Sequence, residues 1–271
     1  MISDTRHTRG GDVSLCFRDT GSGPTVVLLH GTTANLGVWD PVVARLGNGV
    51  RTIAVDQRGH GRSDKPATGY GAAEYCSDVL DLVTELGCGP VVVCGHSLGA
   101  RNAVVLAHQH PEVVVGVVAV DYTPYVEAQV LDDLESRVRG GDRRFETITE
   151  VRSYLRHRYP LLPDDAIERR AGYGYVADHD GVRALAAPTA MVRTVEGLRR
   201  DFDTQTREVA VPVTLLRGEH SRIVSKRAFA ATRSLRPDFH AVEVAGVDHY
   251  IPEEDPDVVA EQILRTVRAV T

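Results

Sequence analysis

Short runs of apolar, often β-branched residues alternate along the chain with segments whose apolar residues recur at three- and four-residue spacing. The runs predict strands, and several are apolar throughout, as strands buried on both faces of a parallel sheet are. These runs are Val13–Phe17, Thr25–Leu29, Thr52–Val55, Val91–Cys94, Val115–Val120, Val213–Arg217 and His240–Val244. The intervening segments predict helices over Glu74–Leu86, Ala100–Gln109, Lys226–Leu235 and Pro256–Val270. This alternation is typical of an α/β fold with a doubly wound, mostly parallel sheet.

The alternation stops after Val120 and resumes only near residue 210. From about Thr123 to Val209 the sequence is charged, has helical spacing and lacks strand-like runs. We therefore predict a core formed by residues 1–122 and 210–271, with residues 123–209 inserted into it as a helical cap. Because no low-complexity linker separates the two parts, we expect the cap to fold against the core as a lid.

Composition narrows the class of partner. The chain has 271 residues and a net charge of −6, so it offers no reason to expect binding to nucleic acid or to an anionic membrane. A small-molecule substrate is favoured, and a homodimer is compatible with the sequence. The four cysteines form no C-x-x-C pair, and no apolar run approaches the ~20 residues needed to span a bilayer. We expect a reduced, cytoplasmic protein without a signal segment.

The pentapeptide Gly95-His96-Ser97-Leu98-Gly99 stands between a predicted strand and a predicted helix. A nucleophile elbow needs this context, because the sharp turn admits only glycine or very small residues beside the serine. Gly95 and Gly99 meet that demand. The sequence therefore predicts that Ser97 is the nucleophile of a serine hydrolase.

A serine nucleophile needs a base, and His249 is the late histidine that follows the last predicted strand in a loop, Gly246-Val247-Asp248-His249-Tyr250. The acid is less obvious. Many elbow hydrolases place an Asp three residues beyond the glycine that follows the seventh strand, but Gly218 here is followed at that distance by Ser221. Asp121, at the tip of the sixth predicted strand, is the favoured acid, and Glu219 is the alternative.

The oxyanion of the tetrahedral intermediate requires two hydrogen-bond donors. The backbone N–H of Leu98, the residue after the nucleophile, is the first candidate. The second comes from the loop Leu29-His30-Gly31-Thr32-Thr33, where we expect the Thr32 N–H to serve. We expect His30 to hold this loop rather than to transfer protons. Arg101 and Asn102 follow the elbow, and the sequence does not decide whether they face the site.

Together these motifs, with the segment Asp56 to Asp64, resemble the α/β-hydrolase superfamily across nearly the whole chain. A closer resemblance, to the 2-(acetamidomethylene)succinate hydrolases of bacterial vitamin B6 breakdown, is carried by five segments: Gly95 to Asn102, Asp121 to Tyr125, Arg158-Tyr159-Pro160, Arg217-Gly218-Glu219 and Asp248-His249-Tyr250. That family cleaves an enamide, takes its acid from the end of the sixth strand, and needs neither metal nor organic cofactor. The resemblance thus implies Asp121 as the acid and no cofactor.

A substrate of that family carries two carboxylates, which arginine side chains bind through paired hydrogen bonds. The resemblance therefore implies an anion-binding pocket under the cap. Its expected members are Arg137, Arg158, Tyr159 and Arg170, with Tyr250 beside the base.

Other functions fit the same motifs. Ester, lactone or C–C bond hydrolysis needs the same Ser97, His249 and Asp121 with a different cap pocket. A cofactor-free dioxygenase would use the histidine and the acid but not the serine. A non-catalytic small-molecule receptor would keep only the pocket, and labelling by a fluorophosphonate would distinguish it. Whether a covalent acyl-enzyme forms is left open by the sequence.

Overall fold

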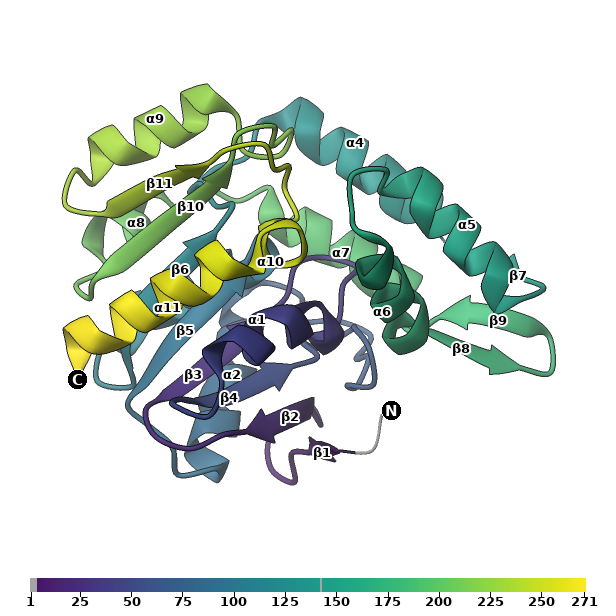
Figure 1. Cartoon of the computed structure of the whole chain (residues 1–271), viewed down its shortest axis with the longest axis horizontal. Helices are drawn as coiled ribbons and strands as arrows, with labels where there is room; N and C mark the ends of the chain where they lie inside the picture. Colours follow the sequence, from purple (N-terminus) through teal and green to yellow (C-terminus); the bar gives the residue numbers. More distant parts are fainter. Residues whose placement is uncertain (1–3, 142) are drawn as a thin grey trace.

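An eight-stranded sheet crosses the computed structural model, which describes residues 4–141 and 143–271 (Figure 1). The strand order is β1-β2-β4-β3-β5-β6-β10-β11. The first two strands pair antiparallel at one edge, and every neighbouring pair from β4 to β11 is parallel. The predicted mostly parallel sheet is therefore confirmed. The strands are β1 (Thr5–His7), β2 (Cys16–Thr20), β3 (Thr25–Leu29), β4 (Arg51–Val55), β5 (Val91–His96), β6 (Val114–Val120), β10 (Val213–Gly218) and β11 (His240–Val244).

Helices cover both faces of this sheet, which is the doubly wound arrangement. On one face Val27 and Val93 pack in a core with residues of α2 and α3, and on the other face Val26 and Cys94 pack with residues of α1 and α11. Apolar burial on both faces explains why the central strands have no polar alternation. The helices of this part are η1 (Leu36–Trp39), α1 (Asp40–Leu46), α2 (Ala72–Glu85), α3 (Leu98–Gln109), α9 (Lys226–Leu235), α10 (Ile251–Glu254) and α11 (Pro256–Val270).

The segment between β6 and β10 is mostly helical but also contains a three-stranded antiparallel sheet of order β7-β9-β8. The expectation that this segment lacks strands was wrong. The strands are two to four residues long and half polar, so they carry too little periodicity to be recognised. The elements are α4 (Ala128–Arg139), β7 (Arg144–Phe145), α5 (Ile148–Arg158), α6 (Asp164–Gly174), β8 (Tyr175–Asp178), β9 (Gly181–Ala184), α7 (Pro188–Leu198) and α8 (Asp203–Glu208).

Two apolar clusters attach this inserted segment to the rest of the chain. In one, Leu131 and Val195 of α4 and α7 pack against Leu98 and Tyr75. In the other, residues of α5 and α6 pack with Tyr250. The inserted segment therefore lies over the end of the sheet that carries the predicted elbow.

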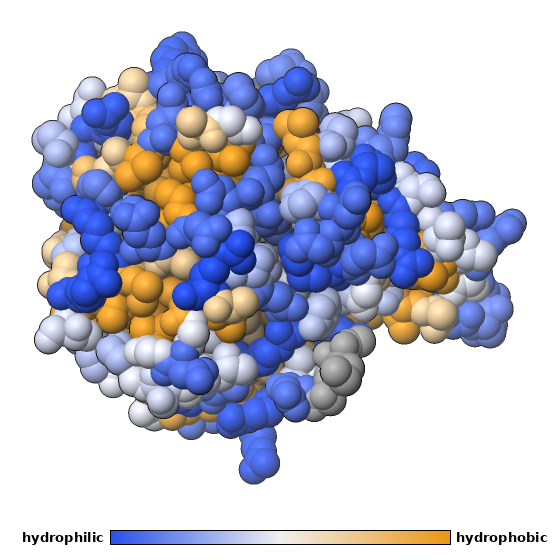
Figure 2. Space-filling model, in the orientation of Figure 1, coloured by the Kyte–Doolittle hydropathy of each residue, from blue (hydrophilic) through white to orange (hydrophobic). Residues whose placement is uncertain are grey.

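Figure 2 shows hydrophilic side chains over most of one face of the molecule, with hydrophobic side chains in smaller patches between them. The domain boundaries at residues 123 and 209 remain a prediction.

The strand expected over Val13–Phe17 starts later, at Cys16, and continues to Thr20. The edge strand β1 and helix α1 were not predicted, because a strand of three mostly exposed residues and a seven-residue helix give weak periodic signals. The other expected strands and helices match the observed bounds within about two residues. Within the described ranges, no helix combines the length and the apolar character that crossing a membrane requires.

Candidate active site

Three residues other than glycine adopt positive φ in the described part of the chain, and each follows a central strand. They are Thr33 after β3 (φ 63°), Ser97 after β5 (φ 53°) and Asp121 after β6 (φ 51°). Side chains avoid this left-handed region, and residues held there cluster at functional sites. Because these strands are neighbours and parallel, the three positions gather at one edge of the sheet.

Ser97 occupies the sharp turn that its sequence context predicts. A Cβ atom added at Gly95 would lie 2.1 Å from the carbonyl oxygen of Gly99, and one at Gly99 would lie 2.0 Å from that of Leu29. Both positions therefore require glycine. The turn places Ser97 directly before the first residue of α3, so the free N–H groups of that helix begin beside its hydroxyl.

The structure brings His249 to Asp121. The Nδ1 atom of the imidazole lies 2.6 Å from Oδ2 of the carboxylate, and the side chain of Asp121 is fully buried. Two further donors hold the same carboxylate: the Gly218 N–H at 3.0 Å from Oδ1 and the Ser221 hydroxyl at 2.6 Å from Oδ2. Because the oxygens of an ionised carboxylate only accept hydrogen bonds, the Nδ1 of His249 must carry a proton when Asp121 is ionised. Its Nε2 is then the nitrogen available to accept a proton.

Ser221 is a residue whose role sequence reasoning missed. It stands where many elbow hydrolases have their acid, and here its hydroxyl donates to Asp121, the candidate acid at the end of β6. The alternative acid, Glu219, lies elsewhere: its carboxylate accepts from the Gly246 N–H at 2.9 Å, and this hydrogen bond lowers its pKa. Glu219 therefore stabilises the loop before His249 and has no hydrogen bond to the imidazole.

The backbone of His249 is held by the residue before the nucleophile. The Nε2–H of His96 donates to the carbonyl of His249 at 2.8 Å, and the two ring centroids lie 4.6 Å apart. Burial lowers the pKa of His96 well below its usual value, so this donor stays neutral. Among the described residues, neither the Ser97 hydroxyl nor the Nε2 of His249 has a hydrogen-bond partner. Such catalytic contacts are often long without substrate, and the link between Ser97 and His249 stays a prediction.

The loop after β3 lies against the nucleophile. A Cβ atom at Gly31 would lie 3.3 Å from the Cβ of Ser97 and 2.9 Å from Nδ1 of His96. Within the described ranges, the N–H groups of Thr32 and Leu98 donate to no protein acceptor. Both expected oxyanion donors are therefore free to bind a substrate oxygen. Their assignment remains a prediction.

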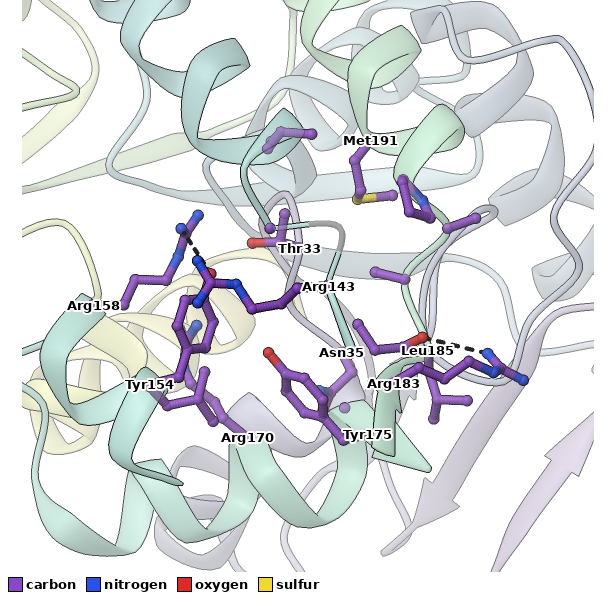
Figure 3. Close-up of a pocket in the computed structure, with 18 of the residues that line it drawn as sticks. Thr33, Asn35, Arg143, Tyr154, Arg158, Arg170, Tyr175, Arg183, Leu185 and Met191 are labelled. Atoms are coloured by element: carbon purple, nitrogen blue, oxygen red, sulfur yellow. Dashed lines mark hydrogen bonds between the residues drawn. The ribbon is translucent and has the colours of Figure 1, made fainter. Parts of the chain in front are cut away.

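A cavity of about 320 Å³ opens between the inserted segment and the loops after β3 and β4, and many of the side chains that line it are cationic. Among the described residues it is lined by seven cationic side chains and by no Asp or Glu: Lys65, Arg137, Arg143, Arg144, Arg158, Arg170 and Arg183. Figure 3 shows Arg143, Arg158 and Arg170 gathered near Tyr154. Arg137, Arg158 and Tyr159 also line a second cavity, of about 630 Å³, whose wall includes His249 and Tyr250. The cationic cavity thus adjoins the candidate base.

The expected anion-binding residues differ in how free their charges are. Arg158 donates to the hydroxyls of Tyr159 and Tyr154, at 3.0 and 3.2 Å, and pairs with no carboxylate in the described part of the chain. Arg170 is paired with Glu253, and both side chains are buried. Arg137 is exposed. Arg158 therefore has a charge available for a ligand, whereas that of Arg170 is already matched inside the protein.

The two tyrosines of the prediction pack on Arg170. Its guanidinium lies 4.5 Å from the ring centroid of Tyr159 and 4.9 Å from that of Tyr250. Burial tends to raise the pKa of Tyr159, but the charges of Arg170 and Arg158 outweigh it and lower that pKa. Burial raises the pKa of Tyr250 above its usual value.

Arg143 and Lys65 line the cationic cavity but were not predicted as binding residues, because neither lies in a motif that marks a site.

A third, small cavity of about 40 Å³ is lined by Ser97 and Asp121 together with apolar side chains such as Leu134 and Phe202. Its size suits a short acyl group. Arg101 reaches this wall from α3 and is 2% exposed, with its guanidinium over Tyr75 and Phe202.

In the described part of the chain, one group of side chains could hold a metal ion: Asp178, His179 and Asp180. This group is exposed on the β8–β9 turn and lines none of these cavities.

Comparison with known proteins decides the family. The profile of the alpha/beta hydrolase family matches residues 26–262, which is most of the chain. The chain belongs to the alpha/beta hydrolase family. This agrees with the sheet order and the elbow, and the expected family resemblance is confirmed.

Individual relatives of this alpha/beta hydrolase are similar over most of its length. A 2-(acetamidomethylene)succinate hydrolase of Mesorhizobium japonicum is 46% identical over 96% of this chain and 93% of its own length. A crystal structure of an E-2-(acetamidomethylene)succinate hydrolase superposes with a TM-score of 0.95 at 45% identity, covering 97% of this chain and 98% of that one. An esterase of Mycobacterium tuberculosis is 27% identical over 96% of this chain and 88% of its own length. The chain is therefore an enzyme, a hydrolase.

Proposed function

We propose that this hydrolase cleaves the amide or enamide C–N bond of a small dicarboxylate such as 2-(acetamidomethylene)succinate. The observation that carries the proposal is the cationic lining of the cavity next to His249. Three of its seven cationic side chains are already paired, Arg170 with Glu253 and both Arg144 and Arg183 with Asp178. The other four have no carboxylate partner among the described residues: Lys65, Arg137, Arg143 and Arg158. The unpaired cationic side chains would compensate a dianion for the hydration it loses on entering the cavity. A neutral substrate would gain no such stabilisation from them. The similarity to the Mesorhizobium enzyme supports the same substrate.

In the proposed mechanism, the cationic side chains hold the carboxylates and present the acyl carbonyl to Ser97. His249 removes the hydroxyl proton through Nε2, while Asp121 fixes the ring through Nδ1 and stabilises the imidazolium that forms. The developing oxyanion accepts from the N–H groups of Leu98 and Thr32. The protonated His249 then gives its proton to the departing nitrogen, which leaves as the enamine.

The second half of the mechanism hydrolyses the acyl-enzyme. A water molecule enters beside His249, which takes one of its protons as the oxygen attacks the acyl carbon. The bond to Ser97 breaks, the proton returns to the serine, and the short acid is released. The small cavity beside Ser97 would hold an acyl group of about the size of acetyl during these steps.

Ester hydrolysis is the second candidate function, because the related Mycobacterium esterase is similar over nearly the whole chain. The same three side chains would serve an ester, with an alcohol leaving in place of the enamine. The cationic lining is the feature that this alternative does not explain.

A substrate panel tests the proposal. It compares 2-(acetamidomethylene)succinate, an acetamido-acrylate that lacks one carboxylate, and p-nitrophenyl acetate. Since a hydrogen bond to a charged group is worth about 1.5–3 kcal/mol, we expect kcat/KM to fall roughly 10- to 100-fold when one carboxylate is removed. Equal kcat/KM for the two enamides, or turnover of the ester alone, would overturn the proposal.

A further inference from the structure

A chain of buried hydrogen bonds connects helix α3 to the loop that carries the Thr32 N–H. We propose that Asn102 and Gln57 are positioning residues which, through His30, fix the orientation of the peptide between Gly31 and Thr32 and so complete the oxyanion hole. The inference rests on the proposed function, because it takes Ser97 as the nucleophile. His30, Gln57 and Asn102 are 0%, 2% and 1% exposed, so none of them contacts solvent appreciably.

The first step concerns the direction of the Thr32 N–H. The Gly31 carbonyl oxygen lies 2.8 Å from Nδ1 of His30 and accepts from the Ala34 N–H at 3.2 Å. In a planar trans peptide the C=O and the following N–H point in opposite directions. Holding the Gly31 carbonyl on one side therefore turns the Thr32 N–H to the other side. If this peptide flipped, a carbonyl oxygen would replace the donor that a developing oxyanion needs.

The second step concerns the tautomer of His30. The backbone N–H of Gln57 donates to Nε2 of the ring at 3.1 Å, so Nε2 must present a lone pair. The ring proton is then on Nδ1, where it donates to Gly31. Burial lowers the pKa of His30 to about 4, which keeps the ring neutral and this tautomer in place near neutral pH.

The third step fixes the Gln57 side chain. Its Nε2 donates to the His30 carbonyl at 2.6 Å, and a carbonyl can only accept, so Oε1 must face the other way. There it accepts from Nδ2 of Asn102, also at 2.6 Å. The His30 carbonyl thus fixes the orientation of the Gln57 side-chain amide, and the Gln57 Oε1 in turn fixes the orientation of the Asn102 amide.

Asn102, the last residue in this series of hydrogen bonds, has a polar atom without a partner among the described residues. The Oδ1 atom of Asn102 is buried and has no partner among the described residues. Buried polar atoms without a partner are rare and disfavour folding, so the position is not explained by stability alone. Asn102 lies in the second turn of α3, the helix that starts at the other donor, Leu98. The chain of hydrogen bonds therefore ties the two halves of the oxyanion hole to each other.

The test compares Asn102→Leu with Val104→Ala, a control on the same helix whose side chain is fully buried in the apolar core. The readout is the rate constant for labelling of Ser97 by a fluorophosphonate, whose phosphoryl oxygen uses the same donors, together with kcat and KM for acyl substrates. Losing an oxyanion donor lowers kcat 10²- to 10³-fold, and we expect a misdirected one to lower kcat and labelling at least about 10-fold. KM and the pH dependence of kcat/KM should be unchanged, since the carboxylate cavity and His249 are untouched.

Thermal unfolding separates positioning from general damage. Asn102→Leu removes one unsatisfied oxygen and leaves another, Oε1 of Gln57, so we expect its melting temperature to stay near that of the wild type. Val104→Ala should melt lower but react normally. If Asn102→Leu does not fold, Gln57→Glu tests the same step, because a carboxylate cannot donate to the His30 carbonyl.

The outcomes are distinguishable. Wild-type enzyme that a fluorophosphonate does not label would contradict the proposed function and this inference with it. A labelled wild type whose rate constant is matched by Asn102→Leu would overturn this inference alone. A loss confined to KM, or equal losses in Asn102→Leu and Val104→Ala, would also overturn it.

Discussion

The Nδ1 atom of His249 and the Oδ2 atom of Asp121 lie 2.6 Å apart although the two residues are 128 positions apart in the chain. The carboxylate comes from the end of β6, next to the elbow strand, and not from the loop after β10. Asp121 adopts positive φ, a conformation that Asp and Asn tolerate better than most residues. Asp121 can thus occupy this tight turn and still place its carboxylate against the His249 ring.

The first prediction concerns Asp121→Asn. The amide preserves the shape and tolerates the backbone conformation, but it no longer stabilises the imidazolium or selects the productive tautomer of His249. Loss of the acid in a comparable triad lowers kcat by about 10⁴, and we expect a similar fall here, measured as steady-state kcat. Glu219→Gln is the control and should keep wild-type kcat. The reverse pattern would assign the acid to Glu219.

The second prediction moves the acid. Ser221 Oγ and His249 Nδ1 contact the same oxygen of Asp121, at 2.6 Å each, so a carboxylate at position 221 would lie near the ring. We expect Asp121→Asn with Ser221→Asp to recover at least roughly 10-fold of the kcat lost in Asp121→Asn, about 1.4 kcal/mol of the activation barrier. A double variant no faster than the single one would show that position 221 cannot orient His249.

The third prediction concerns Arg158, whose guanidinium lines both large cavities and pairs with no carboxylate among the described residues. In Arg158→Ala we expect KM for the dicarboxylate to rise roughly 10- to 100-fold, since a hydrogen bond to a charged group is worth about 1.5–3 kcal/mol. Hydrolysis of p-nitrophenyl acetate should not change. The matched control is Arg152→Ala on the same helix, where the arginine pairs with Glu168 at 2.8 Å and lines neither cavity. Equal effects of the two variants would argue against a carboxylate site at Arg158.

The fourth prediction concerns Arg170, which is buried with Glu253. Removing one partner of a buried ion pair strands the other charge, so we expect Arg170→Met to lower the free energy of unfolding by about 3–5 kcal/mol. Adding Glu253→Leu should restore much of this loss, because the stranded charge is gone. Urea unfolding of both variants is the measurement. An Arg170→Met protein as stable as the wild type, with only KM raised, would instead make Arg170 a pure substrate ligand.

The fifth prediction concerns acid stability. Burial lowers the pKa of His60 to about 3, whereas an unfolded histidine titrates near 6.5. Between these values the unfolded chain binds a proton that the folded chain does not, so stability falls as the pH falls from about 6.5 to about 3. At pH 5 this histidine should lower the unfolding free energy by about 2 kcal/mol relative to neutral pH.

Unfolding by urea at pH 7 and pH 5 measures that dependence. In His60→Gln the drop between the two pH values should be smaller by about the same 2 kcal/mol. His157→Gln, at an exposed position of α5, should leave it unchanged. If the unfolding free energies of the wild type and both variants depended on pH in the same way, the lowered pKa of His60 would be contradicted.

Much of the architecture follows from local patterns. The bounds of β3, β11, α9 and α11 agree with the predicted ones residue for residue, because strong apolar periodicity and clear helix caps mark their ends. The position of Asp121 also followed from topology, since a strand beside the elbow strand must end at the same edge of a parallel sheet. These inferences need only the order of elements along the chain.

The remainder depends on contacts between distant segments. Arg170 and Glu253 are 83 residues apart, so no local pattern shows that the charge of Arg170 is matched inside the protein. Ser221 could be seen as the residue that replaces an acid, but not as a donor to an acid 100 positions earlier. The short strands β7, β8 and β9 are stabilised by pairing with one another rather than by their own apolar pattern.

Rapid mixing of the enzyme with 2-(acetamidomethylene)succinate, followed by acid quenching and peptide mass spectrometry, tests the central claim most directly. The account predicts one acetyl group on the peptide that contains Ser97, and no acetylated peptide in Ser97→Ala, whose kcat should fall by about 10⁶. Full activity of Ser97→Ala, or the acetyl group on a different residue, would contradict it.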